Sequence, residues 1–388
     1  MHRASPLHKT YFYRKFCQMR VSFLLLLVIV STSLAAQYQQ KLLIGTYTQS
    51  GSHGIYVALF DTLTGQLILH DSVSASNPSF LCLSPNGRNV YAVSETAADK
   101  PGTVLAFDFS HETGTLKFLN GQSSGGDHPC HLSMDEMGRF VVVANYSGGS
   151  LSVLPVDKLG TLKPAVQVVQ RSGKGPNVQR QEKPHVHQAL FSPRQKHVVI
   201  ADLGTDEVVA YPFEKAKPAP LDTGRRAIRV GMAGGSGPRH VAFHPTRSVF
   251  YVIEELSGNI SVHTFKKRKI TRRQTIACDT ISKQPGSADI HVSPDGRFVY
   301  ATNRAEANNI CIYSVRKNNG LLERSGCVPV EGLTPRNFTI HPSGKWLLVA
   351  NQNSHQVVVF ERDVETGQIR PSGKELNLPS PVCLVFAH

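Results

Sequence analysis

Basic and ionisable side chains stand at the start of several short apolar stretches of this sequence, and these residue types are suited to chemistry on an anion. Arg239 and His240 follow the turn GSGP, and Arg336 follows TP in the same way. A planar guanidinium group binds carboxylate or phosphate, whereas imidazole exchanges a proton near neutral pH. Glu255 and Arg304 stand at the ends of other apolar stretches, which form a second set. Whether the two sets form one site depends on the elements that carry them.

Those elements are copies of one repeat. Each copy has a hairpin turn between two apolar strands, a third strand, and a fourth strand that often follows a TG turn. Six of the hairpin turns are separated by 51, 57, 52, 49 and 48 residues, at Gly87, Gly138, Gln195, Arg247, Gly296 and Gly344. Four short strands in about fifty residues are the signature of a β-propeller blade.

The chain contains seven first strands, and the seventh, SPVCLVFAH, ends the sequence without partners. The missing partners are at the other end, in KLLIGTYTQS, HGIYVALFD and GQLILHDS. The sequence therefore predicts an all-β fold, a seven-bladed β-propeller closed by pairing the C-terminal strand with N-terminal strands. Such closure leaves no open sheet edge. Residues 37–388 are predicted to form this single domain.

The propeller geometry places the polar residues on one face. First strands line the channel and second strands return antiparallel, so first-strand starts and second-strand ends share one mouth of the channel. Three arginines on this rim exceed what its acids require, and a buried arginine is costly without an anion. A polar funnel with several ionisable groups is the expected site, and its expected ligand is anionic.

The motifs KPHVHQALFSP, GSGPRHVAFHP, YVIEELSGNISV, ADIHVSPDGRFVYATNR and TPRNFTIHPSGKWLLVANQ resemble the β-propeller lactonase family. That family includes bacterial 6-phosphogluconolactonase and fungal 3-carboxymuconate lactonising enzymes, and the resemblance runs from about Leu42 to Phe386. It implies hydrolysis, or reversible formation, of a lactone that bears an acidic group. The catalytic set that it implies is His187, Arg239, Glu255 and Arg304. The expected substrate contacts are His185, His240, Arg336 and Asn303.

Lactone hydrolysis requires an activated water, a stabilised oxyanion and a proton for the leaving alkoxide. Either His187 or Glu255, acting through a water, is a candidate general base. Either Arg239 or Arg304 is a candidate for holding the oxyanion. The other arginine, with Arg336, would then bind the acidic group of the substrate. The sequence shows no credible serine-nucleophile elbow, so we expect no covalent acyl-enzyme.

Two further features bear on the site. His185 and His187 form an HxH pair, which can hold zinc or copper if His131 or His240 supplies a third ligand. Structural or substrate-facing histidines are the commoner use of such a pair, so we expect no metal cofactor. The loop RSGKGPNVQRQEK before this pair lengthens its repeat and is either a substrate lid or a surface insertion.

Three functions fit these residues. The first is a lactonase that hydrolyses an acidic sugar lactone, as 6-phosphogluconolactonase does. The second is a muconate-type lactonising cycloisomerase, which closes an unsaturated dicarboxylic acid on the same residues. The third is a non-catalytic propeller that binds protein or carbohydrate, which predicts a functional surface elsewhere. The expected partner is a small anionic lactone, and no nucleic-acid motif is present.

The N-terminus predicts export. From Met19, which is an alternative start to Met1, the chain has a basic start, the apolar run 21–30 and small residues before Gln37. This is a secretory signal-peptide pattern over residues 1–36, with an apolar run too short to span a membrane comfortably. We therefore expect a periplasmic or extracellular protein without stable membrane insertion of the mature chain. Sugar phosphates are scarce outside the cytoplasm, so an unphosphorylated lactone is an alternative substrate.

Charge and cysteine content add two expectations. The net charge is +14, and it falls to +9 without residues 1–36, which contain five basic residues and no acid. The densest basic run, KKRK at 266–269, lies between two expected strands and is predicted to be a solvated hairpin turn. Six of the seven cysteines follow residue 36 without zinc-site spacing. Export permits disulfides, but the spacing does not pair them.

Overall fold

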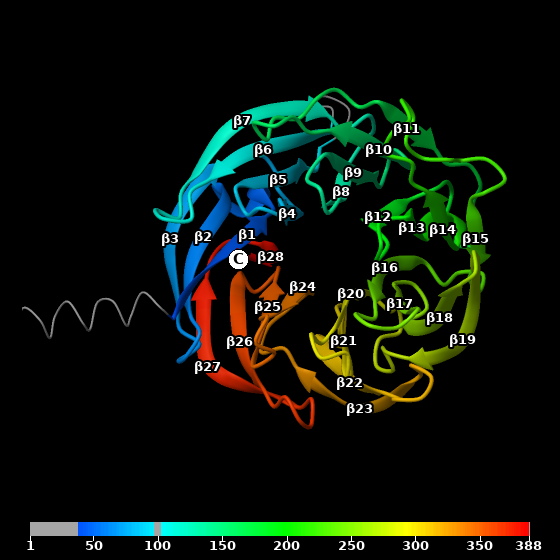
Figure 1. Ribbon diagram of the computed structural model, residues 1–388. Coiled ribbons are helices and arrows are strands. Elements are labelled where there is room, and N and C mark those ends of the chain that lie inside the picture. The colour runs from blue at the N-terminus through cyan, green and yellow to red at the C-terminus, as the bar shows by residue number, and fades with distance from the viewer. Residues whose placement is uncertain (1–37, 97–101, 388) are drawn as a thin grey trace, which may run out of the picture.

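Seven four-stranded antiparallel sheets form a closed ring in the computed structural model, which describes residues 38–96 and 102–387 (Figure 1). The predicted signal peptide, Met19 and Cys17 lie outside the described residues. The predicted seven-bladed β-propeller is confirmed, and the seven predicted first strands contain β4, β8, β12, β16, β20, β24 and β28. Within the described ranges, no helix has the length and apolar character needed to cross a membrane.

The strands of the first four blades in chain order, with the closing strand given first, are β28 (Pro381–Phe386), β1 (Gln39–Thr46), β2 (Gly54–Asp61), β3 (Leu67–Ser74); β4 (Leu81–Leu83), β5 (Asn89–Ser94), β6 (Thr103–Phe109), β7 (Leu116–Ser123); β8 (Pro129–Met134), β9 (Phe140–Asn145), β10 (Ser150–Pro155), β11 (Gln167–Gln170); β12 (Val186–Phe191), β13 (His197–Asp202), β14 (Glu207–Pro212), β15 (Ile228–Gly231). The strands of the other three are β16 (Pro238–Phe243), β17 (Val249–Glu254), β18 (Asn259–Lys266), β19 (Lys269–Ala277); β20 (Ser287–Val292), β21 (Phe298–Asn303), β22 (Asn309–Val315), β23 (Leu322–Pro329); β24 (Pro335–Ile340), β25 (Trp346–Asn351), β26 (Gln356–Arg362), β27 (Ile369–Asn377). Two short 3₁₀ helices are η1 (Thr48–Ser50) and η2 (Leu203–Thr205).

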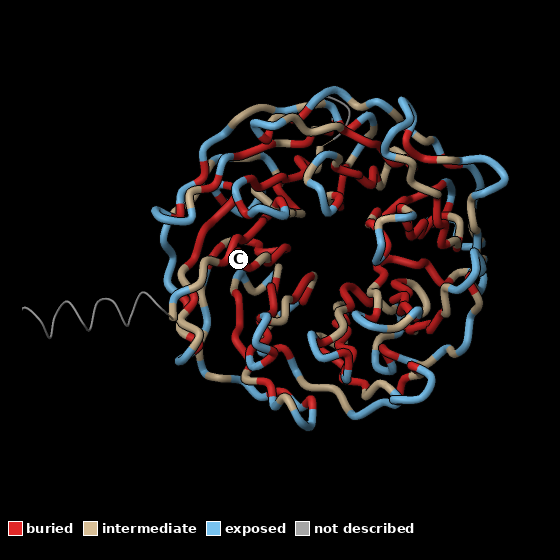
Figure 2. Tube along the Cα trace, viewed as in Figure 1, coloured by how far each residue is buried: buried red, intermediate tan, exposed pale blue. Residues whose placement is uncertain are grey.

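Burial follows the position of a strand within its blade (Figure 2). Second strands such as β25, with the sequence WLLVAN, are buried along their whole length. They are covered on both faces because neighbouring blades pack face to face, and a strand buried on both faces reads as a continuous apolar run. Outer strands such as β27 alternate buried or half-buried with exposed residues over most of their length. The apolar runs seen in the sequence are therefore the inner half of each blade.

The ring closes through the predicted pairing of the two chain ends. β28 pairs antiparallel with β1, with Leu43 opposite Val385. The closing blade also packs on the blade before it, where Phe60 meets Trp346 edge-on at 5.9 Å and the Trp346 indole donates to the Thr62 carbonyl at 2.9 Å. The closure removes the open edges that a broken ring would expose.

One buried carboxylate joins three consecutive blades at the channel. Asp289 of β20 lies 2.7 Å from Nδ1 of His240 on β16 and 2.9 Å from Nε2 of His291 on its own strand. The Asn337 amide of β24 donates to the same carboxylate at 2.6 Å. Burial raises the pKa of Asp289, but His291 and His240 hold that pKa well below its usual range. The channel wall is thus held by charge and by apolar packing together.

Candidate active site

A change of register at the start of several first strands directs their side chains into the channel. In β12 the pairing with β13 moves from Val186 to Gln188 and passes over His187. In β16 it passes over Arg239, and in β24 it passes over Arg336. A bulge of this kind leaves one residue out of the ladder and re-aims its side chain. Three of the residues expected in the site are therefore the extra residues of bulges.

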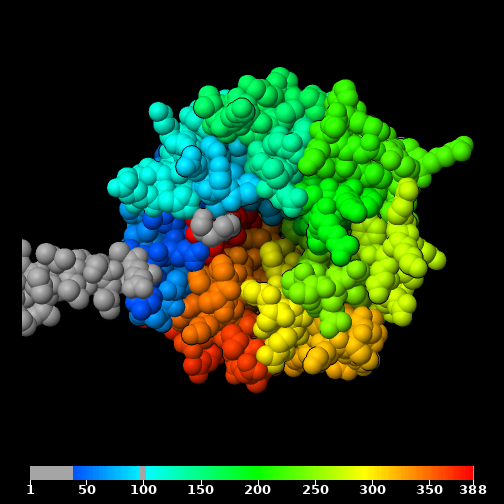
Figure 3. Space-filling model, in the orientation of Figure 1, coloured from blue at the N-terminus to red at the C-terminus, as the bar shows by residue number. Residues whose placement is uncertain are grey.

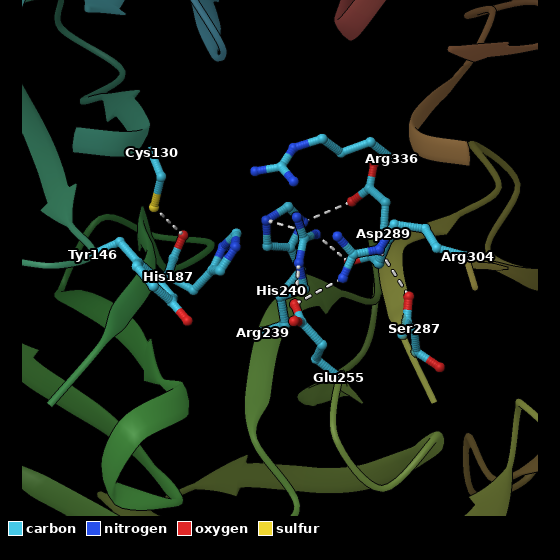
Figure 4. A network of polar contacts seen from close by, with 12 residues as sticks. Cys130, Tyr146, His187, Arg239, His240, Glu255, Ser287, Asp289, Arg304 and Arg336 are labelled. Atoms are coloured by element: carbon cyan, nitrogen blue, oxygen red, sulfur yellow. Dashed lines mark hydrogen bonds and ion pairs between the residues drawn. The ribbon is translucent and has the colours of Figure 1, made fainter. Parts of the chain in front are cut away.

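Glu255 is the centre of the site (Figure 4). It directly follows β17, and its Oε2 lies 2.9 Å from Nε of Arg239 and 3.0 Å from Nη2 of Arg304. Oε1 accepts from Nη2 of Arg180 at 2.7 Å. Burial raises the pKa of the Glu255 carboxyl, but Arg304, Arg239 and Arg180 hold that pKa well below its usual range. Glu255 is consequently a permanent carboxylate at neutral pH.

Arg180 is a site residue that the sequence did not single out. It lies in the loop between β11 and β12, the insertion for which a lid and a surface role were both considered. Its guanidinium group reaches the buried Glu255 and also donates to the Tyr146 hydroxyl at 3.3 Å. Because the loop has no counterpart in the other repeats, only its basic character and its extra length pointed toward the site.

A cavity of about 180 Å³ opens beside this cluster. Figure 3 shows the hollow at the centre of the ring on this face. The cavity is lined by Glu95, Cys130, Tyr146, Arg180, His187, Glu255, Arg304 and Arg336. A smaller space of about 10 Å³ adjoins it and shares Cys130, His187 and Arg336 with it. The smaller space is close to the volume that one water molecule needs.

Arg336 is the cavity arginine that has no acidic partner within 4 Å among residues 38–96 and 102–387. Its Nη2 donates to the Tyr47 hydroxyl at 2.8 Å, and Tyr47 in turn donates to Glu95 at 2.8 Å. The two spaces are thus lined by four arginines and two carboxylates. The arginines are Arg336 and the three that contact Glu255, and the carboxylates are Glu95 and Glu255. An excess of two positive charges therefore lines the two spaces, which favours an anionic ligand.

The His187 imidazole is the ionisable ring at the centre of this charge. It is buried, and its Nδ1 has no hydrogen-bond partner in the described part of the chain. Burial first, and then Arg239, hold the pKa of His187 well below its usual value. His240 is held by Asp289, and burial and Arg239 lower its pKa to about 4. Both rings are therefore neutral at physiological pH, and His187 is the one that faces the larger cavity.

The structure brings most of the predicted residues together. His187, Glu255, Arg304 and Arg336 line the larger cavity, and Arg239 and His240 line the small space. Burial and Arg304 lower the pKa of Arg239 to about 10, which leaves it charged at neutral pH.

Two predicted substrate contacts lie elsewhere. Asn303 ends β21 with its amide inside the blade, where Ser287 donates to it at 2.6 Å and it donates to Asn309 at 2.8 Å. His185 is not among the residues that line the cavity, and its Nε2 lies 3.1 Å from the Glu182 carboxylate. Both side chains have protein partners, and neither is among the residues that line the two spaces.

The HxH pair does not present two imidazoles side by side. The Tyr146 ring contacts both, stacking on His185 at 4.5 Å and meeting His187 edge-on at 5.4 Å. The two-residue alternation of a regular strand, on which the shared-face expectation rests, is broken by the bulge at His187. In the described ranges, no three His, Cys, Asp or Glu side chains are grouped as metal ligands.

The chain is similar in sequence and fold to several known proteins. A family model described as lactonase, 7-bladed beta-propeller, matches residues 41–386. The chain is 37% identical to the 6-phosphogluconolactonase of Bacillus subtilis over 353 residues, which cover 89% of this chain and 97% of that protein. It is also 37% identical to the 6-phosphogluconolactonase of Formosa agariphila, over 86% of this chain and 95% of that protein. The solved structure of the periplasmic gluconolactonase of Pseudomonas aeruginosa superposes with a TM-score of 0.85 at 34% identity, covering 90% of this chain and 99% of that one.

The Glu255 cluster predicts a large loss of stability in Glu255→Gln. The substitution removes the charge that compensates the buried Arg239 guanidinium group and the partly buried one of Arg304, and breaking a buried ion pair costs about 3–5 kcal/mol. Urea denaturation measures the change in the free energy of unfolding. Glu182→Gln is the matched control, because the Glu182 carboxylate is half exposed, and its effect should stay within about 0.5 kcal/mol. Equal effects of the two substitutions would show that the arginines do not depend on Glu255.

Proposed function

The chain belongs to the seven-bladed β-propeller lactonase family, and we propose that it hydrolyses an acidic sugar lactone at the channel mouth. It is a lactone-hydrolysing enzyme, and the substrate proposed for it resembles 6-phosphogluconolactone. The observation that carries this proposal is the charge of the cavity: Arg336 lacks an acidic partner and lies beside a buried neutral histidine. Both curated relatives described above are named for hydrolysis of that phosphorylated lactone.

Substrate binding begins at Arg336. Its guanidinium group is available to pair with a phosphate or carboxylate. The group lies over the Tyr47 ring and donates to the Tyr47 hydroxyl, which holds it in place. Arg180 enters the same cavity from the loop between β11 and β12, with its side chain 43% exposed. We propose that Arg180 makes a second contact to the acidic group of the substrate. The two arginines would hold the lactone with its carbonyl toward Arg239 and Arg304.

His187 is the proposed general base. A water in the small space between His187 and Arg239 attacks the lactone carbonyl carbon, and its proton passes to the His187 imidazole. Arg239 or Arg304 stabilises the oxyanion of the tetrahedral intermediate. The intermediate collapses with cleavage of the ring C–O bond, and His187 returns the proton to the leaving alkoxide. The product is the open hydroxy acid, which releases one proton to solvent at neutral pH.

Glu255 has a different role in this scheme. A carboxylate that three guanidinium groups hold far below its usual pKa is a weak base, so it is poorly suited to accept a proton from water. Its role is to position Arg239, Arg304 and Arg180. The three guanidinium groups on Glu255 therefore support His187 over Glu255 as the proposed base.

Export of the protein is part of the proposal. It is supported by the signal-peptide pattern of residues 1–36 and by a disulfide between Cys311 and Cys327, which face each other across β22 and β23. Structural disulfides persist in oxidising compartments outside the cytoplasm. Fractionation of cells that express the full chain tests this: recovery of an uncleaved protein in the cytoplasm would contradict it.

The first experiment is base uptake in a pH-stat by residues 37–388. The panel contains 6-phosphogluconolactone, glucono-δ-lactone and muconolactones. We expect enzyme-dependent opening of a sugar lactone that is lost in Arg239→Ala and unaffected by EDTA. Opening of a muconolactone in preference to both sugar lactones would favour the cycloisomerase. No rate above spontaneous opening on any member would favour the non-catalytic binding platform.

Substituting Arg336 should separate charged from uncharged substrates. We expect Arg336→Gln to raise KM for 6-phosphogluconolactone at least tenfold, because it loses a charge-assisted contact worth about 1.5–3 kcal/mol. KM for glucono-δ-lactone, which has no acidic group, should change by less than about threefold. Initial rates on the two lactones measure this. Arg297→Gln, at an exposed arginine that pairs with Glu365, is the charge-matched control. Equal losses on both lactones would place the anion contact elsewhere.

The lowered pKa of His187 predicts an unusual acid limb. A general base works when unprotonated, so kcat/KM should stay constant as pH falls and decline only below the ordinary histidine pKa of about 6.5. Glucono-δ-lactone is the substrate for this profile, because it has no ionisable group of its own. His187→Gln should remove the limb together with most of the activity. A decline with its midpoint at or above about 6.5 would assign the limb to another group.

A further inference from the structure

A basic groove lies on the face of the ring opposite the channel mouth, between the blades β12–β15 and β16–β19. Its volume is about 370 Å³. Three turns bound it, at residues 192–196 between β12 and β13, 244–248 between β16 and β17, and 267–268 between β18 and β19. The catalytic residues of these blades stand at the opposite ends of the same strands. The groove is therefore separate from the proposed active site.

The groove is lined by cations without acids. Five basic side chains line it, Arg194, Lys196, Arg247, Lys267 and Arg268, and no Asp or Glu is among its lining residues. Within residues 38–96 and 102–387, none of the five pairs with a carboxylate within 4 Å.

The neighbouring hollow on this face, about 460 Å³ between the blades β8–β11 and β12–β15, has a different character. There Glu214 pairs with Lys217 at 2.8 Å, and Asp135 lies 3.9 Å from Arg139. The groove between the blades β12–β15 and β16–β19 thus differs from this hollow, whose lining combines basic residues with acids.

The backbone of the bounding turns gives an independent observation. Lys267 and Arg268 are the two central residues of a two-residue hairpin loop, in which Lys266 pairs with Lys269. Their φ angles are 48° and 61°. A loop with two left-handed residues strongly favours Asn-Gly, because a side chain is disfavoured in that conformation. The chain therefore places two long cations where local conformation disfavours them.

The same conflict recurs on the other side of the groove. Arg194 and Gln195 have φ angles of 92° and 55°. In the hairpin turns of four other blades the position of Gln195 is a glycine, at Gly87, Gly138, Gly296 and Gly344. Natural sequences depart from local preference mainly at functional sites. Arg194 lines the groove, as Lys267 and Arg268 do, whereas Gln195 lines the neighbouring hollow.

We propose that this groove is a second binding site, which takes a ligand that carries at least two phosphate groups. Guanidinium groups match phosphate oxygens in a fixed geometry, and Arg194, Arg247 and Arg268 approach the groove from its three bounding turns. The volume suits a small molecule or a headgroup, and Phe243 and Phe265 provide an apolar surface beside the cations. Burial and the adjacent Arg268 lower the pKa of His197, which is consistent with a positive field in the groove.

The test uses a variant that removes the charges and improves the turn. Lys267→Asn combined with Arg268→Gly installs the favoured Asn-Gly loop, so the variant should fold at least as well as the native chain. Calorimetric titration of the purified protein with inorganic pyrophosphate in 150 mM NaCl should give one binding event that is at least tenfold weaker in this variant. Lactone hydrolysis should be unchanged, because the groove is outside the channel mouth.

The matched control is Lys117→Gln combined with Lys317→Gln, which removes two exposed lysines from other blades. It should bind pyrophosphate as the native protein does. Equal weakening in both double variants, or undiminished binding in the groove variant, would overturn the proposal. Sedimentation with cardiolipin vesicles, whose lipid headgroup carries two phosphates, distinguishes the source of the phosphate. Loss of vesicle binding in the groove variant alone would assign the groove to a lipid headgroup. Absence of binding to both probes would reject it.

Discussion

The buried Glu255 carboxylate is the constraint on which the catalytic face depends. Three guanidinium groups from three different segments meet on its two oxygens: Arg239 from the start of β16, Arg304 from the end of β21, and Arg180 from the loop before β12. Arg239, which is the most deeply buried of the three, depends most on this compensating charge. The loop at 171–183 must therefore reach inward for the cluster to be complete, which makes the insertion part of the site.

Ring closure is the second requirement for the same site. Arg336 rests on Tyr47, which is 289 residues away in sequence and directly follows β1. These two side chains meet only when β28 pairs with β1 and completes the closing blade. The pairing that removes the open sheet edges thus also positions Arg336, the cavity arginine that has no acidic partner among the described residues. The anion-binding cavity is therefore complete only in the closed ring.

The sequence predicted the blades, their number, the closure and the face of the site, because each follows from a repeat and from local apolar patterning. Side-chain direction at strand ends was harder to predict. Asn303 and Arg304 are adjacent in sequence. The Asn303 amide makes its hydrogen bonds inside the blade, whereas the Arg304 side chain lines the cavity. The bulge at His187 breaks the alternation that would have paired it with His185. Arg180 lies in a segment without a repeat, so no comparison between blades could identify it.

The positive charge of the cavity gives its two ionisable candidates opposite roles. Arg304 and Arg239 hold the pKa of Glu255 well below its usual range against the effect of burial, which makes it a poor base. Burial, together with Arg239 and Arg304, lowers the pKa of His187, which keeps it unprotonated. A lowered pKa also weakens the basicity of His187. An anionic group bound at Arg336 offsets part of that positive potential, so the imidazole becomes more basic when the acidic lactone is in place. An uncharged lactone would bind without this effect, and the charge of the substrate therefore contributes to catalysis as well as to affinity.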